Sequence, residues 1–198
     1  LRKKQYAVSM DEMKKLPIAR NCIMGKVHNA RWVLERAVRD HSMQIDVPEV
    51  KAESDTLKRT LKEINKCEDI DRLRGLEGEA ASTYFRAFDE LILQQKKDFI
   101  FQGRNKRPPM DNVNALLSFV YTLLANSMAS ALEAVGLDPY VGFMHTDRPG
   151  RCSLALDMME ELRSSFADRF VLTLINKKIV TGKQFKKSEN GAVILKED

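Results

Sequence analysis

Along most of the chain, apolar residues recur at steps of three and four, which is the period of a helix with one buried face. Between residues 18 and 41 this spacing is shared by Ile23, Val27, Trp32 and Leu34. The pattern predicts an amphipathic helix there, with its apolar stripe on a core. Comparable patterns predict further helices over 48–67, 69–95, 113–135 and 153–179.

Residues with strong end preferences mark where some of these helices begin and end. Pro48 stands at the start of one helix, where its missing N–H is not needed. Asp111 can cap the helix that follows the loop 102–112, and Gly136 ends that helix. These signals predict separate helices joined by loops.

The last residues of the chain follow a different pattern. The dipeptide Asn190-Gly191 stands between β-prone residues, which is typical of a two-stranded turn. The predicted fold class is therefore mainly α with a short C-terminal β-hairpin, and residues 1–198 are expected to form one α-helical domain.

The most apolar segment, 113–137, is long enough to suggest a membrane helix. Polar residues recur through it: Asn114, Ser118, Thr122, Asn126, Ser127, Ser130 and Glu133. We therefore expect a buried central helix of a globular protein and no membrane association.

Composition and charge narrow the class of protein only slightly. Lysine and arginine exceed aspartate and glutamate by 33 to 28, and the isoelectric point is about 9.1. This balance permits nucleic-acid binding without establishing it. The three cysteines form no CxxC pair, which favours a reduced, cytoplasmic protein.

Several sequence motifs of common enzyme classes are absent. The chain contains no GxxxxGK[ST] phosphate loop, GxSxG elbow, HExxH helix or GxGxxG turn. NTPases, serine hydrolases, zinc proteases and dinucleotide enzymes are therefore disfavoured.

The stretch "RGLEGEAASTYF" places Glu77 between Gly75 and Gly78 on a predicted helix. Each glycine costs a helix about 1 kcal/mol relative to alanine, so something should compensate. Either the glycines allow close helix packing, or they leave room for a ligand beside Glu77.

His145 lies in the loop "GFMHTDRPGR", ahead of the helix predicted at 153–179. A single loop histidine serves either a structural or a catalytic role. The apolar residues of the following helix recur every four positions and predict its core stripe: Leu154, Met158, Leu162, Phe166 and Phe170.

Three acidic residues of that helix lie off the stripe, namely Asp157, Glu160 and Glu161. Acidic residues near a helix start often only complement the helix dipole. On a helical wheel Glu160 and Glu161 border opposite edges of the stripe, so the wheel alone does not choose a ligand between them.

Taken together, one imidazole and two carboxylates form a nitrogen and oxygen ligand set. Such a set suits Mn²⁺ or Mg²⁺ and is tolerable for Zn²⁺. Two basic clusters either neutralise a phosphodiester or are solvated surface: Arg104, Lys106 and Arg107, and Arg148, Arg151 and Arg163. Metal ligands beside arginines suggest chemistry on a phosphate backbone.

Four motifs occur in an order that resembles a known family: "RGLEGEAASTYF", "RNKRPPMDNVNALLSFVYTLL", "GLDPYVGFMHTDRPGRCSLALDMMEELR" and "FADRFVLTLIN". They resemble consecutive motifs of the CRISPR-associated spacer integrase, the metal-dependent endonuclease-integrase of CRISPR adaptation. The chain also resembles the subgroup found with type I systems of the C variety.

The resemblance implies a fold and a metal site. In the family a small N-terminal β-rich domain precedes an α-helical catalytic domain, and this chain resembles only the second. Because it begins without Met, we expect a piece of a longer protein. The family's glutamate, histidine and acidic metal ligands fall on Glu77, His145 and Glu160, which leaves Asp157 as an auxiliary acid.

The resemblance also implies an activity and partners. A DNA 3′-OH would attack a phosphodiester at the edge of a CRISPR repeat, and water in its place would give nuclease activity. The six basic residues would position DNA through its backbone. Family members dimerise and work with a small second adaptation protein. The alternative is a noncatalytic helical DNA-binding or assembly module.

Overall fold

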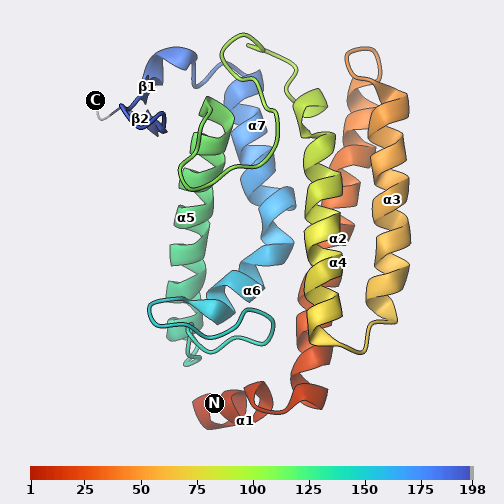
Figure 1. The fold of residues 1–198 in the computed structure, drawn as a ribbon, viewed down its shortest axis with the longest axis vertical. Helices are drawn as coiled ribbons and strands as arrows, with labels where there is room; N and C mark the ends of the chain where they lie inside the picture. Colours follow the sequence, from red (N-terminus) through yellow and green to blue (C-terminus); the bar gives the residue numbers. More distant parts are fainter. Residues whose placement is uncertain (197–198) are drawn as a thin grey trace.

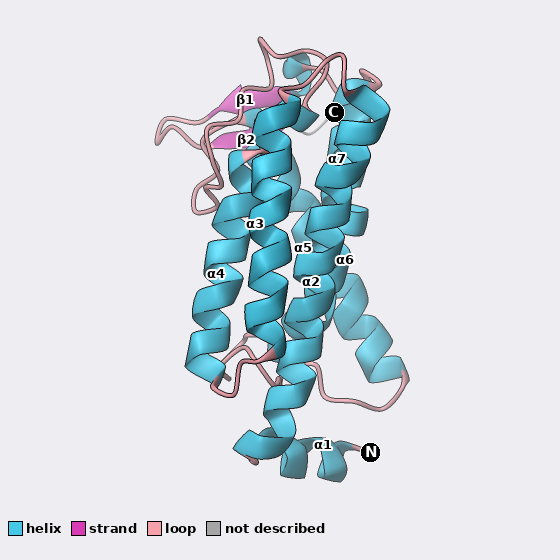
Figure 2. Cartoon of the chain, turned by 90° about the vertical axis from the view of Figure 1, so that its right-hand side faces the viewer, coloured by secondary structure: helices cyan, strands magenta, loops and turns pink. Residues whose placement is uncertain are grey.

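The computed structural model describes residues 1–196, which form a bundle of helices with a two-stranded sheet at one end (Figure 1). The helices are α1 (Arg2–Ser9), α2 (Glu12–His41), α3 (Val47–Asn65), α4 (Ile70–Arg86), α5 (Asn112–Ala134), α6 (Ser153–Leu162) and α7 (Arg169–Asn176). Three short turns of other helix types are η1 (Phe88–Leu91), η2 (Arg163–Asp168) and η3 (Gly182–Gln184). The long helices run side by side along one axis, and α1 lies across one end (Figure 2).

The predicted fold class is confirmed. Helices make up most of the described chain, and the sheet consists of β1 (Phe185–Lys187) and β2 (Val193–Leu195). The strands pair antiparallel with Phe185 opposite Leu195. Gly191, in the turn between them, has a φ of +83°, a conformation that favours glycine. The hairpin at Asn190-Gly191 is therefore the one that the turn signal predicted.

Aspartate side chains fix the starts of four helices. Asp11, Asp46, Asp69 and Asp111 each accept a hydrogen bond from a backbone N–H of the first turn. Each such cap is worth about 1 kcal/mol. The cap at Asp111 is the one predicted from the sequence, and the other three have the same chemical cause.

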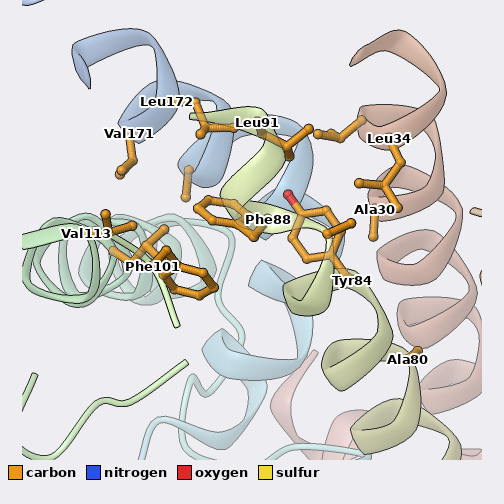
Figure 3. Packing of buried hydrophobic residues seen from close by; sticks show 14 of the residues in the cluster. Ala30, Leu34, Ala80, Tyr84, Phe88, Leu91, Phe101, Val113, Val171 and Leu172 are labelled. Atoms are coloured by element: carbon orange, nitrogen blue, oxygen red, sulfur yellow. The ribbon is translucent and has the colours of Figure 1, made fainter. Parts of the chain in front are cut away.

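The core lies where α2, α4 and the segment after α4 meet α5 and α7. Tyr84, Phe88 and Phe101 pack ring against ring in its centre, with Phe88 and Phe101 centroids 5.0 Å apart (Figure 3). Trp32, which the pattern placed on the buried stripe of α2, is 52% exposed instead. Its indole N–H donates to His28 on the surface.

The helix predicted at 69–95 is shorter than expected. α4 ends at Arg86, and after the turn η1 the chain becomes extended at Ile92. The side chain of Asn176 on α7 forms the hydrogen bonds of the backbone groups here. It donates to the Leu91 carbonyl and accepts from the Leu93 N–H. Tertiary hydrogen bonds therefore replace those that a longer helix would have made.

α5 is less buried than predicted. Its buried face includes Val113, Leu117 and Val120, but Phe119 and Leu123 are about half exposed. In its most apolar 18-residue window, the mean hydropathy is 1.5 and only 28% of the window is buried. By length and composition alone this helix could cross a membrane, a test that core helices of soluble proteins also pass.

The predicted helix over 153–179 is not one continuous α-helix. Its middle, η2, is a π-helical turn, which is wider than an α-turn. The predicted stripe steps by four residues each time, so it drifts by about 40° per step around a helix of 3.6 residues per turn and is wrong in its second half. Phe166 and Phe170 are exposed, while Ala167 and Val171 are buried in their place.

η2 also brings a carboxylate into the core. Asp168 is buried and accepts a hydrogen bond of 2.6 Å from the Tyr121 hydroxyl of α5. Burial raises the pKa of Asp168 to about 6, although the tyrosines and the nearby arginines favour its charged form. The carboxylate therefore ionises in the folded protein only at a higher pH than in the unfolded chain.

Replacing Asp168 by asparagine should stabilise the protein more at pH 7 than at pH 4. Because the pKa of Asp168 is raised from 3.8 to about 6 on folding, wild type loses stability as pH rises through this window. Asparagine cannot ionise and shows no such loss. The gain of Asp168→Asn over wild type should grow by on the order of 2–3 kcal/mol between the two pH values. Urea unfolding checks this, and a constant or shrinking gain contradicts it.

Replacing Asp111 by alanine should destabilise the protein more than replacing Asp46. Asp111 caps α5 and also accepts from the buried Asn114 amide at 2.7 Å, whereas the exposed Asp46 accepts from one backbone N–H of its helix. We expect a loss of about 1 kcal/mol for Asp46→Ala and about 2–3 kcal/mol for Asp111→Ala. Equal losses in urea unfolding would show that the Asn114 contact contributes nothing.

A candidate metal centre in a basic cleft

A cleft of about 1550 Å³ runs between α2, α4, α5, α6 and η2, and two loops close its rim. All six basic residues singled out from the sequence line it: Arg104, Lys106, Arg107, Arg148, Arg151 and Arg163. The polar face of α5 lines it too, through Ser118, Thr122 and Asn126. The cleft therefore accounts for three of the seven polar residues that recur along that apolar helix.

Asp157 holds the loop that carries His145. Its carboxylate is fully buried and accepts from the backbone N–H groups of Phe143, Met144 and His145 at 2.6–3.0 Å. It also lies 2.6 Å from Nδ1 of the His145 ring. A carboxylate at Nδ1 places the proton there and leaves Nε2 with its lone pair free for a ligand.

Gly142 lets this loop approach α6. A Cβ built at residue 142 would lie 2.8 Å from an Asp157 oxygen and 2.9 Å from the Ser153 side chain. Any other residue would push the loop away from Asp157. Steric crowding therefore requires glycine at the first position of the "GFMH" motif in this chain.

Glu160, three residues after Asp157, is only 2% exposed and lies behind the residues that line the cleft, in contact with Lys26 and Arg163. One oxygen, Oε1, lies 3.0 Å from the Arg163 guanidinium and 4.0 Å from Nε2 of His145. Burial alone raises the pKa of Glu160, but the charges of Lys26 and Arg163 outweigh it and hold the pKa below its usual value. The side chain is therefore a buried carboxylate.

Among the residues that the structure describes, none donates a hydrogen bond to the other oxygen of Glu160, Oε2. The ammonium of Lys26 lies 2.7 Å away as an ion pair, outside hydrogen-bond geometry. A buried acceptor without a donor is unusual in a folded protein. It is the kind of atom that a metal ion would satisfy.

Glu77 reaches the same place from α4, where it forms an ion pair with Lys26. Within residues 1–196, no atom beyond the neighbouring residues and backbone of α4 itself lies within 4 Å of a Cβ built at Gly75 or at Gly78. The glycines therefore do not serve close helix packing, which was one of the two interpretations of this motif. Gly78 lines the cleft beside Glu77, so the open space there is accessible to a ligand.

Lys26 is the residue that the sequence pattern missed. It projects from α2 and is 12% exposed, with Glu77 on one side and Glu160 on the other. The sequence did contain a signal that Lys26 lies on the apolar face of α2, because it follows Ile23 by three residues and precedes Ala30 by four. A lysine on an apolar helix face needs a buried counter-charge.

Tyr121 lies between two arginines of the cleft. The guanidinium groups of Arg104 and Arg163 lie 5.4 and 5.1 Å from its ring centroid, within cation–π range. Arg104 also donates to Asn114 at 2.7 Å and to Ser118 at 3.1 Å. These two arginines are held in place, whereas Lys106, Arg107 and Arg148 are exposed on the rim.

The donor set fits a divalent cation with one qualification. Glu77, Glu160 and Nε2 of His145 approach one another, and Asp157 supports the histidine as metal sites require. Within residues 1–196, however, no three acidic, histidine or cysteine side chains form a ready ligand cluster. Lys26 stands between Glu77 and Glu160, where the cation would have to bind.

Comparisons with known proteins point in one direction. The profile of the family "CRISPR associated protein Cas1" matches residues 1–198. A "CRISPR-associated endonuclease Cas1 1" of Chlorobaculum tepidum is 48% identical over the whole chain, which spans 58% of that relative's length. A "CRISPR-associated endonuclease Cas1" of Leptospira interrogans is 44% identical, and the chain spans 78% of it.

Solved structures share the fold. A CAS1 protein from Thermotoga maritima superposes with a TM-score of 0.84 at 26% identity, covering 99% of this chain and 58% of that one. A casposase bound to its integration product gives 0.80 at 28% identity, covering 97% and 54%. A partial Cas6-RT-Cas1–Cas2 complex gives 0.83 at 25% identity, covering 96% and 56%. With the family profile matched from end to end, the chain belongs to the CRISPR associated protein Cas1 family.

Proposed function

We propose that this chain is the catalytic domain of a metal-dependent DNA endonuclease-integrase that inserts spacer DNA into a CRISPR array. One observation carries the proposal. Glu77 and Glu160, far apart in the sequence, pair with the same lysine, and Nε2 of His145 lies 4.0 Å from Glu160, beside a cleft lined by six basic residues. A nitrogen and oxygen ligand set beneath a phosphate-binding surface supports chemistry on a nucleic-acid backbone.

Glu77, His145 and Glu160 would hold Mn²⁺ or Mg²⁺. Such an ion supplies charge stabilisation at the attacked phosphate and activates the attacking hydroxyl. Asp157 keeps the proton of His145 on Nδ1, so that Nε2 stays free as a ligand. Arg104 and Arg163, which Tyr121 holds in place, would position a phosphodiester over the carboxylates.

The reaction is a transesterification. The 3′-OH oxygen of the incoming DNA forms a bond to phosphorus, the bond from phosphorus to the O3′ of the repeat strand breaks, and that oxygen takes up a proton. Water as the nucleophile gives strand cleavage instead. The casposase structure, which is bound to an integration product, and the relatives named as endonucleases support both outcomes.

The relatives of this chain suggest the partners with which it acts. The Cas6-RT-Cas1–Cas2 complex supports a small Cas2-like partner for this chain as well. We further propose homodimerisation, a cytoplasmic location without a membrane, and the type I-C subgroup.

The alternative function, a noncatalytic DNA-binding or assembly module, is favoured by one observation. Lys26 neutralises both Glu77 and Glu160, as a purely structural ion cluster would. Measuring Mn²⁺ binding by calorimetry and DNA cleavage in Mn²⁺, Mg²⁺ and chelator distinguishes the two. DNA binding without metal binding or cleavage would favour the module.

Replacing Glu160 by glutamine should abolish metal-dependent DNA cleavage while leaving the protein folded. Glutamine keeps the shape and one carbonyl oxygen but lacks the charge that a divalent cation needs. We expect activity to fall by about a thousandfold or more, in the range seen when an electrostatic catalytic group is lost. Nuclease assays in Mn²⁺ check this, with urea unfolding as the test of folding.

Glu161→Gln is the matched control for this experiment. Glu161 is the next residue of α6 and is exposed, whereas Glu160 is buried and pairs with Lys26 and Arg163. Its replacement should leave cleavage within about twofold of wild type, as for an exposed residue without a buried partner. If Glu161→Gln does the greater damage at equal stability, Glu160 is not the ligand.

Replacing Gly78 by alanine should stabilise the fold yet weaken DNA binding. Both Gly75 and Gly78 lie in α4 with open space at the Cβ position, so alanine should stabilise either site by about 1 kcal/mol. Only Gly78 lines the cleft, so only there should DNA affinity fall, by about fivefold or more, which is about 1 kcal/mol. Equal DNA affinity in both variants would show that the DNA does not approach α4.

A further inference from the structure

The ammonium of Lys26 occupies the place where the two carboxylates of the cleft meet. It is in contact with Oε1 of Glu77 and lies 2.7 Å from Oε2 of Glu160. These carboxylates come from α4 and α6, while Lys26 comes from α2. Three helices therefore meet at one positive charge.

The contacts of Lys26 differ from those of the second cation at Glu160. Arg163 pairs with Oε1, lies one turn along the same helical segment, and stacks on Tyr121. Lys26 pairs with Oε2 without hydrogen-bond geometry, through a flexible four-carbon chain. If Lys26 moves away, Glu160 keeps Arg163, and Oε2 becomes free.

The side chain of Lys26 also has space into which it can move. Its side chain lines the large cleft, so the ammonium can swing into solvent-accessible space without unfolding α2. A divalent ion and the ammonium would repel each other strongly if both stood between the same carboxylates. The repulsion is larger for a doubly charged ion than for a singly charged one.

We propose that Lys26 is an exchangeable internal counter-ion, which a divalent cation must displace to bind Glu77 and Glu160. In the metal-free protein it neutralises the two carboxylates. Metal affinity is then set partly by the cost of moving Lys26. This inference rests on the metal centre proposed above.

The test is Lys26→Met, which keeps an unbranched chain and removes the charge. Mn²⁺ alone is the ligand, its affinity is measured by calorimetry, and melting is followed in chelator and in Mn²⁺. In chelator the variant should melt at a lower temperature than wild type, because two buried carboxylates lose their counter-ion. Its Mn²⁺ affinity should be at least about tenfold higher, since the competitor is gone.

Lys15→Met is the matched control. Lys15 lies on the same helix, is 18% exposed, and pairs with Glu12 away from the cleft. The Lys15→Met substitution removes the same net charge as Lys26→Met, so any effect of overall charge on Mn²⁺ affinity appears in both variants. Its affinity should stay close to that of wild type.

Lys26→Gln is a second variant in case methionine prevents folding. Its amide can still donate to one carboxylate, but it carries no charge. It should bind Mn²⁺ more tightly than wild type as well.

The outcomes separate the two proposals. Equal or weaker Mn²⁺ binding by the folded Lys26 variants would overturn the inference, because Lys26 would then be a permanent bridge that helps to assemble the site. Tighter binding by these variants than by wild type and Lys15→Met supports it, including the case in which only they bind. If none of the proteins binds Mn²⁺, the metal centre itself is wrong and the inference falls with it.

Discussion

The burial of two carboxylates on α6 is the constraint on which the rest of the site depends. Asp157 and Glu160 lie one turn apart on that helix and are both withdrawn from water. A buried charge must be compensated by hydrogen bonds or by opposite charge. Asp157 uses the backbone of the loop before α6, and Glu160 uses Lys26 and Arg163. The hydrogen bonds to Asp157 hold the His145 loop against α6, and the ion pair between Lys26 and Glu160 holds α2 against the same helix.

The π-helical turn after Glu160 serves this arrangement. It lies between the site on α6 and helix α7. As a result Arg163 can pair with Glu160 while Asp168 still reaches Tyr121. The same tyrosine then holds Arg163 and Arg104 by its ring. A local departure from α-helical geometry thereby links the carboxylates of the centre to the basic wall of the cleft.

Much of the fold was predictable because its signals are local. The cap at Asp111 and the turn at Asn190-Gly191 depend on residues next to one another in sequence. The wide turn η2 has no such local signal, and the stripe through Phe166 and Phe170 was misplaced because it followed a strict four-residue step. Such a stripe turns by about 40° per step relative to a helix of 3.6 residues per turn, so its error accumulates along the helix.

The site was predictable in part for a different reason. The family resemblance, and not the helical wheel, selected Glu160, which the structure places inside the buried face and not at its edge. Nothing in the neighbourhood of Lys26 reveals its partners, because Glu77 and Glu160 lie 51 and 134 residues further along the chain.

The proposed metal site raises a folding problem that Lys26 would solve. Carboxylates that bind a divalent cation must converge, yet converging carboxylates repel one another until the ion arrives. Arg163 cannot relieve this alone, since it contacts only one oxygen of Glu160. A lysine on a third helix neutralises both acids and holds α2, α4 and α6 together in the metal-free state. Because its chain is flexible and borders the cleft, this stabilisation can be given up when the ion enters, without loss of the fold.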